Sequence, residues 1–364
     1  MSNKIACFVS PHGFGHAART CAVLEALYDR VPGLRVDIFT TVPEWFFTDS
    51  LRFPFVYHPC ECDIGMVQRS PLHEDVDATV ARLGQFLPFA SERIEKLGWT
   101  LRELGARAVL CDISALGIAA AQKAGVPSIL IENFTWDWLY EGYVDEHPSM
   151  VMFARYLATL YAQVTVRIQT QPVCHAVAGA YSVGLISRRR RSSSAATRQA
   201  LGVPAQDRMI LLTMGGVSHP GVLGTYFSSL PNLTVVIPNN VPRIERHGGL
   251  VLLPWHSPIY HPDLVAAAEV VIGKLGYSTV AEVYHAGSAL AWLHRPKFRE
   301  SAAMATFVRT CMNQVELKES ALADGTWVTA IEPLLGLPRR PPVTANGAAA
   351  AAEIIADVLR RTST

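Results

Sequence analysis

Short apolar runs alternate with helix-length stretches along most of this chain. Runs of strand length lie at residues 5–9, 36–39, 108–111, 128–131, 209–213, 234–237, 250–253, 270–272 and 289–293. Helix-like stretches at 17–28 and 115–124 separate some of them, and an Ala-rich helix is predicted at 347–361. Strands that are apolar throughout are buried on both faces, so their alternation with helices predicts an α/β fold with parallel sheets between layers of helices.

The pattern lapses between about residues 165 and 190 and then restarts. The four consecutive arginines at 188–191 lie in this break, and we expect a solvated linker or helix start there rather than a phosphate or nucleic-acid site. Each half of the chain opens with an apolar strand and a glycine-containing loop. We therefore predict an N-terminal domain at 1–170, a C-terminal domain at 171–345 and a helix at 346–364 that packs back on the N-terminal domain.

Composition narrows the possible functions. The 364 residues include 32 Lys and Arg against 31 Asp and Glu, which argues against a nucleic-acid partner because such binding needs a broad basic surface. No run approaches the roughly 20 apolar residues of a membrane helix, so stable membrane insertion is not expected. The seven scattered cysteines favour reduced thiols in the cytoplasm. Cys60 and Cys62 lack a second ligand pair at zinc spacing, so no metal site is expected.

Three glycine loops follow apolar strands and lead into helices. Such a loop directs backbone N–H groups and the positive end of a helix dipole toward the carboxyl edge of the sheet, which makes it an anion site. Gly13 and Gly15 lie in the first loop, Gly215 and Gly216 in the second, and the third spans residues 273–282.

The first loop satisfies the G-x-G-x-x-G/A dinucleotide fingerprint through Gly13, Gly15 and Ala18. The second strand ends without the carboxylate that would bind a ribose, so nicotinamide or flavin binding is the weaker interpretation. His16 begins the following helix and is a candidate for proton transfer, the alternative being a residue that only caps the loop.

The third loop is predicted to enter a helix capped by Ser278 or Thr279. Glu282 follows Thr279 by three residues, so it either completes a capping box or accepts hydrogen bonds from a ribose diol. Lys274 either meets a phosphate or is solvated. Neither Ser nor Thr follows the Gly-Lys pair, so this is not a Walker A loop and ATP hydrolysis is disfavoured.

Two carboxylates are expected at the carboxyl edge of the first sheet. Asp112 ends the strand at 108–111, and Asp137 lies in the aromatic segment 133–138 after the next strand. Aromatic rings beside a carboxylate suit a sugar-like ligand, with Asp137 as hydrogen-bonding group or base. An equally good interpretation is a helix start with a core tryptophan and Asp137 as its cap.

Together these loops resemble those of GT-B glycosyltransferases, and the loop that ends in His16 looks like the start of MurG-type enzymes. A closer resemblance is to the N-terminal, glycosyltransferase-like half of plant L-arabinokinases. It covers roughly residues 5–360 and rests on Gly13–Ala17, Asn133–Asp137 with Tyr140 and Tyr143, Gly273–Tyr277 and Phe298–Glu300. It does not extend to their sugar-kinase half, so sugar phosphorylation is not expected.

The resemblance implies two Rossmann-like domains facing across a cleft, the first binding the acceptor and the second the nucleotide sugar. It implies an inverting, metal-independent transfer from a nucleotide sugar, with a UDP-sugar favoured, to a hydroxyl of a small molecule or natural product. The donor is a co-substrate, and no other cofactor is implied. We expect a monomer or a homodimer.

The resemblance also assigns candidate residues. His16 holds the place of the histidine that faces the donor–acceptor junction. Asp137 and Asp112 are further catalytic candidates because of their positions at the rim of the sheet, not because of the resemblance. Glu282 holds the place of the acidic residue that binds the ribose. The donor-binding candidates are Gly13, Gly15, Gly215, Gly216, Trp255, Lys274, Gly276, Tyr277, Ser278, Glu282, Arg295 and Glu300. Residues 294–300 lack MurG's paired glutamines, which leaves the donor sugar open, and Trp255 either stacks on the base or belongs to the core.

Two other functions remain open from the sequence. One is a nucleotide-sugar sensor of the same fold without catalysis. The other is a nucleotide-sugar epimerase, for which Asp112, Asp137 and Glu300 would supply carboxylates.

Overall fold

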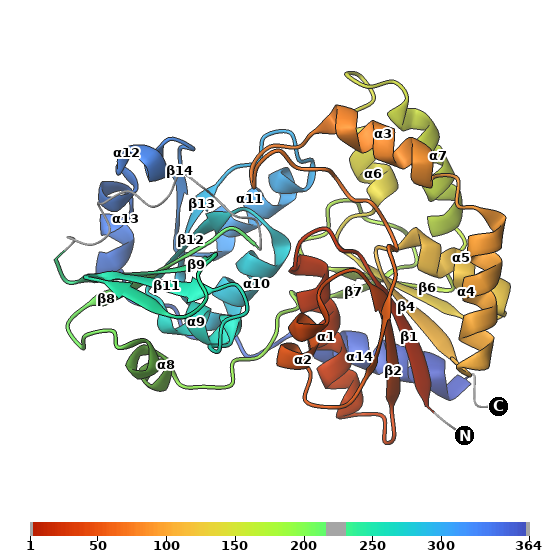
Figure 1. Ribbon diagram of the computed structural model, residues 1–364, viewed down its shortest axis with the longest axis horizontal. Coiled ribbons are helices and arrows are strands. Elements are labelled where there is room, and N and C mark those ends of the chain that lie inside the picture. The colour runs from red at the N-terminus through yellow and green to blue at the C-terminus, as the bar shows by residue number, and fades with distance from the viewer. Residues whose placement is uncertain (1–2, 216–230, 362–364) are drawn as a thin grey trace. The chain divides into compact units, whose positions relative to one another are not determined.

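The computed structural model describes residues 3–215 and 231–361 (Figure 1). The chain divides into two compact units, which are described separately. Unit 1 comprises Met1–Val67, Glu74–Ser187 and Ala345–Thr364, and unit 2 comprises Gln68–His73 and Arg188–Thr344. Unit 1 thus extends beyond the predicted boundary at residue 170, because β7 (Tyr181–Val183) pairs with β6 (Val166–Thr170) at the edge of the first sheet.

Unit 1 is built on a seven-stranded parallel sheet with the order β3-β2-β1-β4-β5-β6-β7. The remaining strands are β1 (Lys4–Val9), β2 (Arg35–Thr40), β3 (Val56–Pro59), β4 (Ala108–Asp112) and β5 (Ser128–Glu132). The helices are α1 (Gly15–Tyr28), α2 (Glu44–Ser50), α3 (Val76–Phe86), α4 (Ser91–Glu103), α5 (Ala115–Ala124), α6 (Trp136–Glu141), α7 (Met150–Tyr161) and α14 (Gly347–Arg361). The strand order reverses where β1 lies between β2 and β4, and a crevice at the carboxyl ends of the strands is expected at such a switch point.

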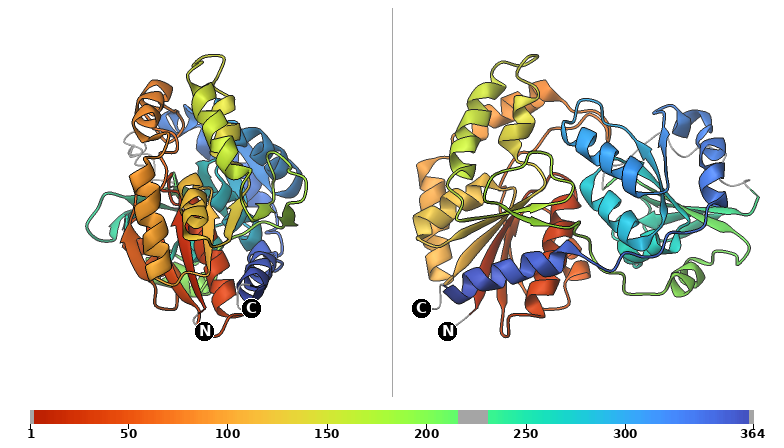
Figure 2. Two further views of the ribbon diagram at one scale, coloured as in Figure 1. Left: turned by 90° about the vertical axis from the view of Figure 1, so that its right-hand side faces the viewer. Right: turned by 180° about the vertical axis from the view of Figure 1, so that it is seen from behind.

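Successive side chains of the central strands point to opposite faces of the sheet and so pack against different helix layers. Cys7 and Leu110 belong to the core on the face covered by α1 and α14, and the small alanines of α14 let it pack close to that core (Figure 2). Phe8 and Cys111 point to the opposite face, where α5 packs on them. Asp112 lies two residues after Leu110, so its carboxylate points to the same face of the sheet, toward α1.

Unit 2 repeats this architecture with the order β10-β11-β9-β8-β12-β13-β14. Its strands are β8 (Arg208–Thr213), β9 (Leu233–Asn239), β10 (Glu245–His247), β11 (Leu250–Pro254), β12 (Val270–Lys274), β13 (Ala289–Leu293) and β14 (Gln314–Leu317). Its helices are α8 (Ser194–Leu201), α9 (His261–Ala267), α10 (Tyr277–Ala286), α11 (Glu300–Cys311), α12 (Ala321–Asp324) and α13 (Trp327–Gly336). The described strands are parallel except for the β10–β11 pair, and the order reverses at β8, between β9 and β12.

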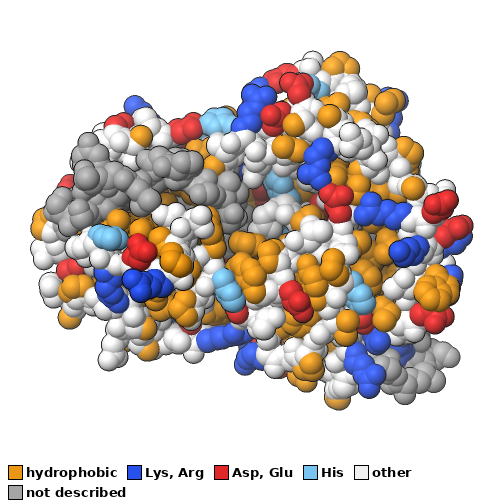
Figure 3. Space-filling model, in the orientation of Figure 1, with side chains coloured by type: hydrophobic (Ala, Val, Ile, Leu, Met, Phe, Trp, Pro, Cys, Tyr) orange, Lys and Arg blue, Asp and Glu red, His pale blue; other side chains and the backbone are white. Residues whose placement is uncertain are grey.

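The surface carries both signs of charge. On the face drawn in Figure 3, acidic and basic side chains are interspersed, as the near-equal numbers of the two kinds suggest. Among residues 3–215 and 231–361, no helix is both long and apolar enough to cross a bilayer.

The contact between α5 and the sheet predicts a specific sensitivity. A Cβ at Gly117 would lie 2.7 Å from Cβ of Phe8 and 2.8 Å from Sγ of Cys111, so Gly117→Ala should lower the free energy of unfolding by about 1–3 kcal/mol. Gly336→Ala is the matched control, because a Cβ there meets no atom within 4 Å and the change should leave stability within about 1 kcal/mol. Urea unfolding of both variants checks this, and equal midpoints would contradict it.

Candidate functional site

The carboxyl edge of the first sheet brings two distant segments together. The loop after β1 turns through Gly13, whose φ of +70° favours glycine, and α1 begins at Gly15. Asp112 ends β4, the neighbouring strand, and Ile113 follows it in the left-handed region at φ +52°. The sharp turn ends the strand beside the first turn of α1.

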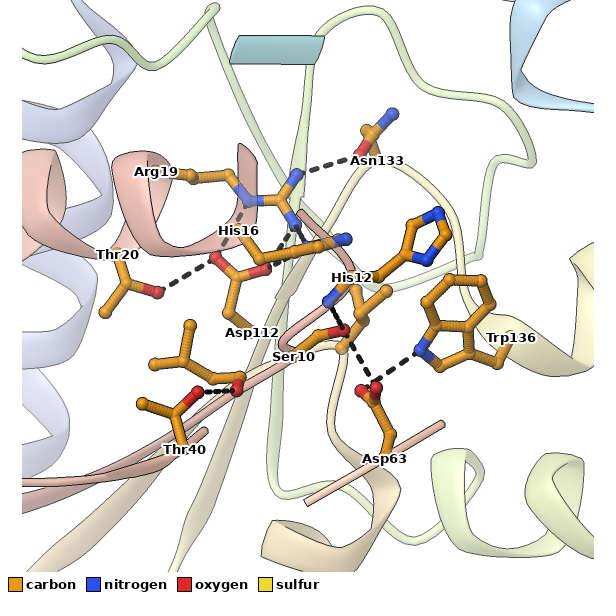
Figure 4. Close-up of polar contacts among 12 residues, drawn as sticks. Ser10, His12, His16, Arg19, Thr20, Thr40, Asp63, Asp112, Asn133 and Trp136 are labelled. Atoms are coloured by element: carbon orange, nitrogen blue, oxygen red, sulfur yellow. Dashed lines mark hydrogen bonds and ion pairs between the residues drawn. The ribbon is translucent and has the colours of Figure 1, made fainter. Parts of the chain in front are cut away.

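One face of α1 supplies partners for the Asp112 carboxylate (Figure 4). His16, Arg19 and Thr20 are spaced i, i+3 and i+4, which places their side chains on the same side of the helix. His16 Nδ1 lies 2.8 Å from Asp112 Oδ1, and Thr20 Oγ1 donates to Oδ2 at 3.0 Å. Arg19 donates from Nε to Oδ2 at 3.0 Å and from Nη2 to Oδ1 at 2.5 Å. The predicted candidates His16 and Asp112 are therefore in direct contact.

Arg19 is the element of this cluster that the sequence analysis missed. Its side chain is 1% exposed, and its Nη1 donates to Asn133 Oδ1 at 2.8 Å. Burial by itself raises the pKa of the Asp112 carboxyl, but the Arg19 charge and the hydrogen bonds from His16 and Arg19 outweigh it and hold the pKa below its ordinary value. Asp112 is therefore ionised at neutral pH.

The ionised carboxylate fixes the tautomer of His16. A carboxylate only accepts hydrogen bonds, so the 2.8 Å contact makes His16 Nδ1 the donor. Arg19 Nη2, which can only donate, also lies 3.2 Å from this nitrogen, but its shorter contact, 2.5 Å, is with Asp112 Oδ1. In the neutral ring Nε2 then carries the lone pair, and Figure 4 shows this second nitrogen pointing away from Asp112. The pair can thus accept a proton at Nε2 and stabilise the resulting imidazolium through Asp112.

A second buried carboxylate, Asp63, lies close to this pair. It accepts hydrogen bonds from Ser10 Oγ at 2.9 Å and from Trp136 Nε1 at 3.2 Å (Figure 4). The ring of His12 meets Trp136 edge-on, with the centroids 5.2 Å apart. Burial raises the pKa of Asp63 to about 6, although the neighbouring His16 and the two hydrogen bonds lower it. Asp63 lies in an irregular segment without a motif, so nothing in the sequence marked it.

Asp137 belongs to a different polar group from the His16–Asp112 pair. It lies in the first turn of α6, and burial raises its pKa, partly offset by hydrogen bonds from the Thr135 side chain and the Trp138 backbone. Its Oδ1 is buried and has no hydrogen-bond partner among the described residues. Burial also raises the pKa of the nearby Glu132 to about 7, although Gln169 donates to Glu132 at 2.8 Å.

In unit 2, two of the predicted glycine loops follow the adjacent strands β8 and β12. Gly215 has φ +65°, and a Cβ there would lie 3.1 Å from Lys274 Cε. Gly273 has to be glycine because a Cβ would lie 2.7 Å from the carbonyl oxygen of Thr213. Gly276 is the N-cap of α10 and faces open space. Backbone N–H groups and a lysine are thus gathered at one edge of the second sheet.

Glu282 does not form the capping box considered above. Helix α10 begins at Tyr277, after the N-cap Gly276, which puts Glu282 well inside the helix. Its Oε1 accepts from Arg188 Nε and Nη2, both at 3.0 Å, and its Oε2 lies 2.9 Å from His261 Nδ1. Burial raises its pKa, but Arg188 and His261 outweigh that effect and lower it. Arg188 is therefore not the solvated linker residue that we expected.

The other donor-binding candidates also lie in unit 2, except Gly13 and Gly15. Trp255 follows β11 and is half-buried, while Tyr277 and Ser278 form the first turn of α10. Arg295 is 3% exposed, with its guanidinium carbon 3.7 Å from the centroid of Phe298. Glu300 is buried at the start of α11. Gly216 lies outside the described residues.

The chain was compared with known protein families, proteins and structures. No family model matches it. The chain is 26% identical to L-arabinokinase of Arabidopsis thaliana over 369 aligned positions, and the alignment covers 96% of this chain but 34% of that protein. The chain thus spans about a third of that relative's length.

Solved structures align with nearly the full length of the chain. The glycotransferase of kitacinnamycin aligns over 99% of this chain and 100% of its own, with a TM-score of 0.65 and 16% identity. MurG of Acinetobacter baumannii aligns over 99% and 100%, with a TM-score of 0.55 and 16% identity. A UGT of Medicago truncatula complexed with UDP-glucose aligns over 98% of each chain, with a TM-score of 0.60 and 11% identity.

The chain has the GT-B fold. The expected fold class and the resemblance to MurG-like glycosyltransferases and to L-arabinokinase are thereby confirmed. In this GT-B chain the His16–Asp112 pair lies at the switch point of unit 1, and the loops of Gly215 and Gly276 lie at that of unit 2.

The buried pair of Arg19 and Asp112 predicts strong coupling. Arg19→Met leaves the Asp112 charge uncompensated and should lower the free energy of unfolding by about 3–5 kcal/mol. Adding Asp112→Asn to Arg19→Met removes the buried charge that has lost its partner. The double variant should therefore be about 1–3 kcal/mol more stable than the sum of the two single-variant effects predicts. Arg52→Met is the control, because the Arg52 side chain is 65% exposed in its pair with Glu25, and it should change stability by less than about 1 kcal/mol. Chemical unfolding of Arg19→Met, Asp112→Asn, the double variant and Arg52→Met measures these effects, and an additive double variant would contradict the coupling.

The raised pKa of Asp63 predicts a pH dependence of stability. Between pH 4 and 6 the native carboxyl keeps its proton while the unfolded one loses it, so stability falls as pH rises through that interval. Asp63→Asn removes the effect. Relative to the wild type, the variant should gain up to roughly 3 kcal/mol between pH 4 and pH 8, since the shift is about 2 pKa units. Urea unfolding across this range tests it, with the exposed Asp145→Asn as control; a pH-independent difference for Asp63→Asn would refute the assignment.

Proposed function

We propose that this GT-B chain transfers a sugar from a nucleotide sugar, with a UDP-sugar favoured, to a hydroxyl of a small-molecule acceptor, inverting the anomeric carbon. The observation that carries the proposal is the contact of 2.8 Å between His16 Nδ1 and Asp112 Oδ1, which leaves Nε2 as a base at the switch point of unit 1. The fold, shared with glycosyltransferases, supports the same reaction class.

The proposed step is a single displacement. The acceptor hydroxyl gives its proton to His16 Nε2 while its oxygen attacks the anomeric carbon of the donor. The bond from that carbon to the diphosphate oxygen breaks, and the electron pair leaves with the nucleoside diphosphate. Asp112 stabilises the imidazolium that forms, and Arg19 keeps Asp112 ionised and in place. Attack from the face opposite the leaving group inverts the configuration.

The proposal assigns the donor to unit 2. The backbone amides of the loops containing Gly215 and Gly276 would bind the diphosphate, with Lys274 as the cation beside them. These groups would stabilise the departing charge without a metal ion, so chelation by EDTA should leave the rate unchanged. The activity named for the Arabidopsis relative is not part of the proposal, because this chain spans about a third of that protein.

The base assignment predicts a separation of binding from catalysis. His16→Ala should lower kcat by about 10²–10⁴-fold, since it removes the general base, while the nucleotide Kd stays unchanged because unit 2 is untouched. His58→Ala is the matched control: His58 Nε2 also lies 2.8 Å from a carboxylate of unit 1, Asp37, but His58 belongs to β3, which β2 separates from β1 and the loop of His16. The transfer rate should therefore persist. Transfer is measured with UDP-, GDP-, TDP- and CDP-sugars and a panel of hydroxyl acceptors.

The same assay separates the competing functions. Absence of turnover together with absence of a thermal shift for every nucleotide sugar contradicts the proposal. Tight binding without transfer to any acceptor indicates a sensor, and conversion of the donor sugar without an acceptor indicates an epimerase. Retained transfer in His16→Ala refutes the base assignment alone.

A further inference from the structure

The carboxylate expected to bind a ribose is already enclosed. The Glu282 side chain is 3% exposed, with Oε1 held by two N–H groups of Arg188 and Oε2 by the ring of His261. A ribose hydroxyl would reach Glu282 only after Arg188 or His261 had moved. As the structure stands, Glu282 faces protein groups instead of solvent.

The outer edge of this cluster is His261. Its side chain is 30% exposed, ten times the fraction of Glu282. The lowered pKa of Glu282 means that its carboxylate is ionised and can only accept, so the 2.9 Å contact makes His261 Nδ1 the donor. In the neutral ring Nε2 is then a hydrogen-bond acceptor, which is what a ribose hydroxyl requires.

His261 Nε2 lies among the loops already assigned to the donor. It is 3.4 Å from Oγ1 of Thr213, the last residue of β8. The carbonyl of Thr213 lies against Gly273 of β12, and Gly215, two residues later, lies against Lys274. The contact with Thr213 is near the long limit for a hydrogen bond, so a ligand hydroxyl can replace it at little cost.

We propose that His261 binds the ribose diol of the nucleotide through Nε2, and that Glu282 and Arg188 are positioning residues behind it. Glu282 fixes the tautomer and orientation of the imidazole, and Arg188 keeps Glu282 ionised and in place. The inference rests on the proposed function only in requiring that unit 2 binds a nucleotide. In this inference the ribose contacts the imidazole of His261, and Glu282 contacts the imidazole but not the ribose.

Calorimetry with UDP and its 2′-deoxy and 3′-deoxy forms tests the assignment. The wild type should bind UDP about 3–10-fold more tightly than at least one deoxy form, as expected for one hydrogen bond. His261→Ala should lose that factor for UDP and bind all three ligands equally. His261→Gln carries an amide oxygen that can also accept, so it should retain part of the discrimination. It also serves as the measurement if His261→Ala fails to fold.

Two further variants separate positioning from simple structural support. Glu282→Gln can donate to Nδ1 and so permits the wrong tautomer, which should reduce the discrimination between UDP and its deoxy forms without abolishing UDP binding. His247→Ala, an exposed histidine of β10 in the same unit, is the control and should leave all affinities unchanged.

The outcomes distinguish this inference from the proposed function. If His261→Ala and His261→Gln keep the full discrimination while Glu282→Gln loses it, Glu282 contacts the ribose directly and the inference is wrong. If His261→Ala weakens UDP and both deoxy forms by the same factor, His261 contacts the diphosphate and the ribose assignment is wrong. If the wild type binds none of UDP, GDP, TDP and CDP, the proposed function fails as well. If GDP or CDP binds best, its own deoxy forms take the place of those of UDP; for TDP, which already lacks the 2′ hydroxyl, the 3′-deoxy form alone is compared.

Discussion

A buried carboxylate has to be compensated, and the compensation of Asp112 organises the carboxyl edge of the first sheet. Asp112 is fully buried, yet it remains ionised because Arg19 lies against both of its oxygens. The same helix face brings His16 to the carboxylate, so one constraint fixes the charge of Asp112 and the tautomer of His16. The proposed base chemistry depends on these two consequences.

The second unit solves the same problem with different residues. Glu282 is buried inside α10 and is compensated by the guanidinium of Arg188 and the ring of His261. In unit 1 the histidine and arginine come from one helix, whereas in unit 2 they come from separate segments. Each unit thus presents an imidazole that a buried carboxylate orients. The imidazole of unit 1 is suited to accept a proton, and that of unit 2 to accept a hydrogen bond from a ligand hydroxyl.

Local sequence patterns predicted the strands and loops of the fold, but they did not predict which distant side chains pair. Fully apolar runs and glycine loops identified the central strands, and the positions of His16 and Asp112 at adjacent strand ends placed them at one edge. Short edge strands such as β3 and β10 were not predicted, because neither is a continuous, buried apolar run. The ion pair of Glu282 with Arg188 could not be predicted from the sequence, because Arg188 lies 94 residues earlier in the chain. The run of arginines that contains Arg188 has the same composition as a solvated linker. The capping box was wrong because α10 begins at Tyr277, two residues before Thr279.

The central claim is that the neutral ring of His16 carries its proton on Nδ1, where it is donated to Asp112, and its lone pair on Nε2. Long-range ¹H–¹⁵N correlation spectra of the ¹⁵N-histidine-labelled protein at alkaline pH measure this directly, with the His16 ring assigned by comparison with His16→Gln. The account predicts the Nδ1–H tautomer for His16. A ring protonated at Nε2, with the lone pair on Nδ1, would contradict it.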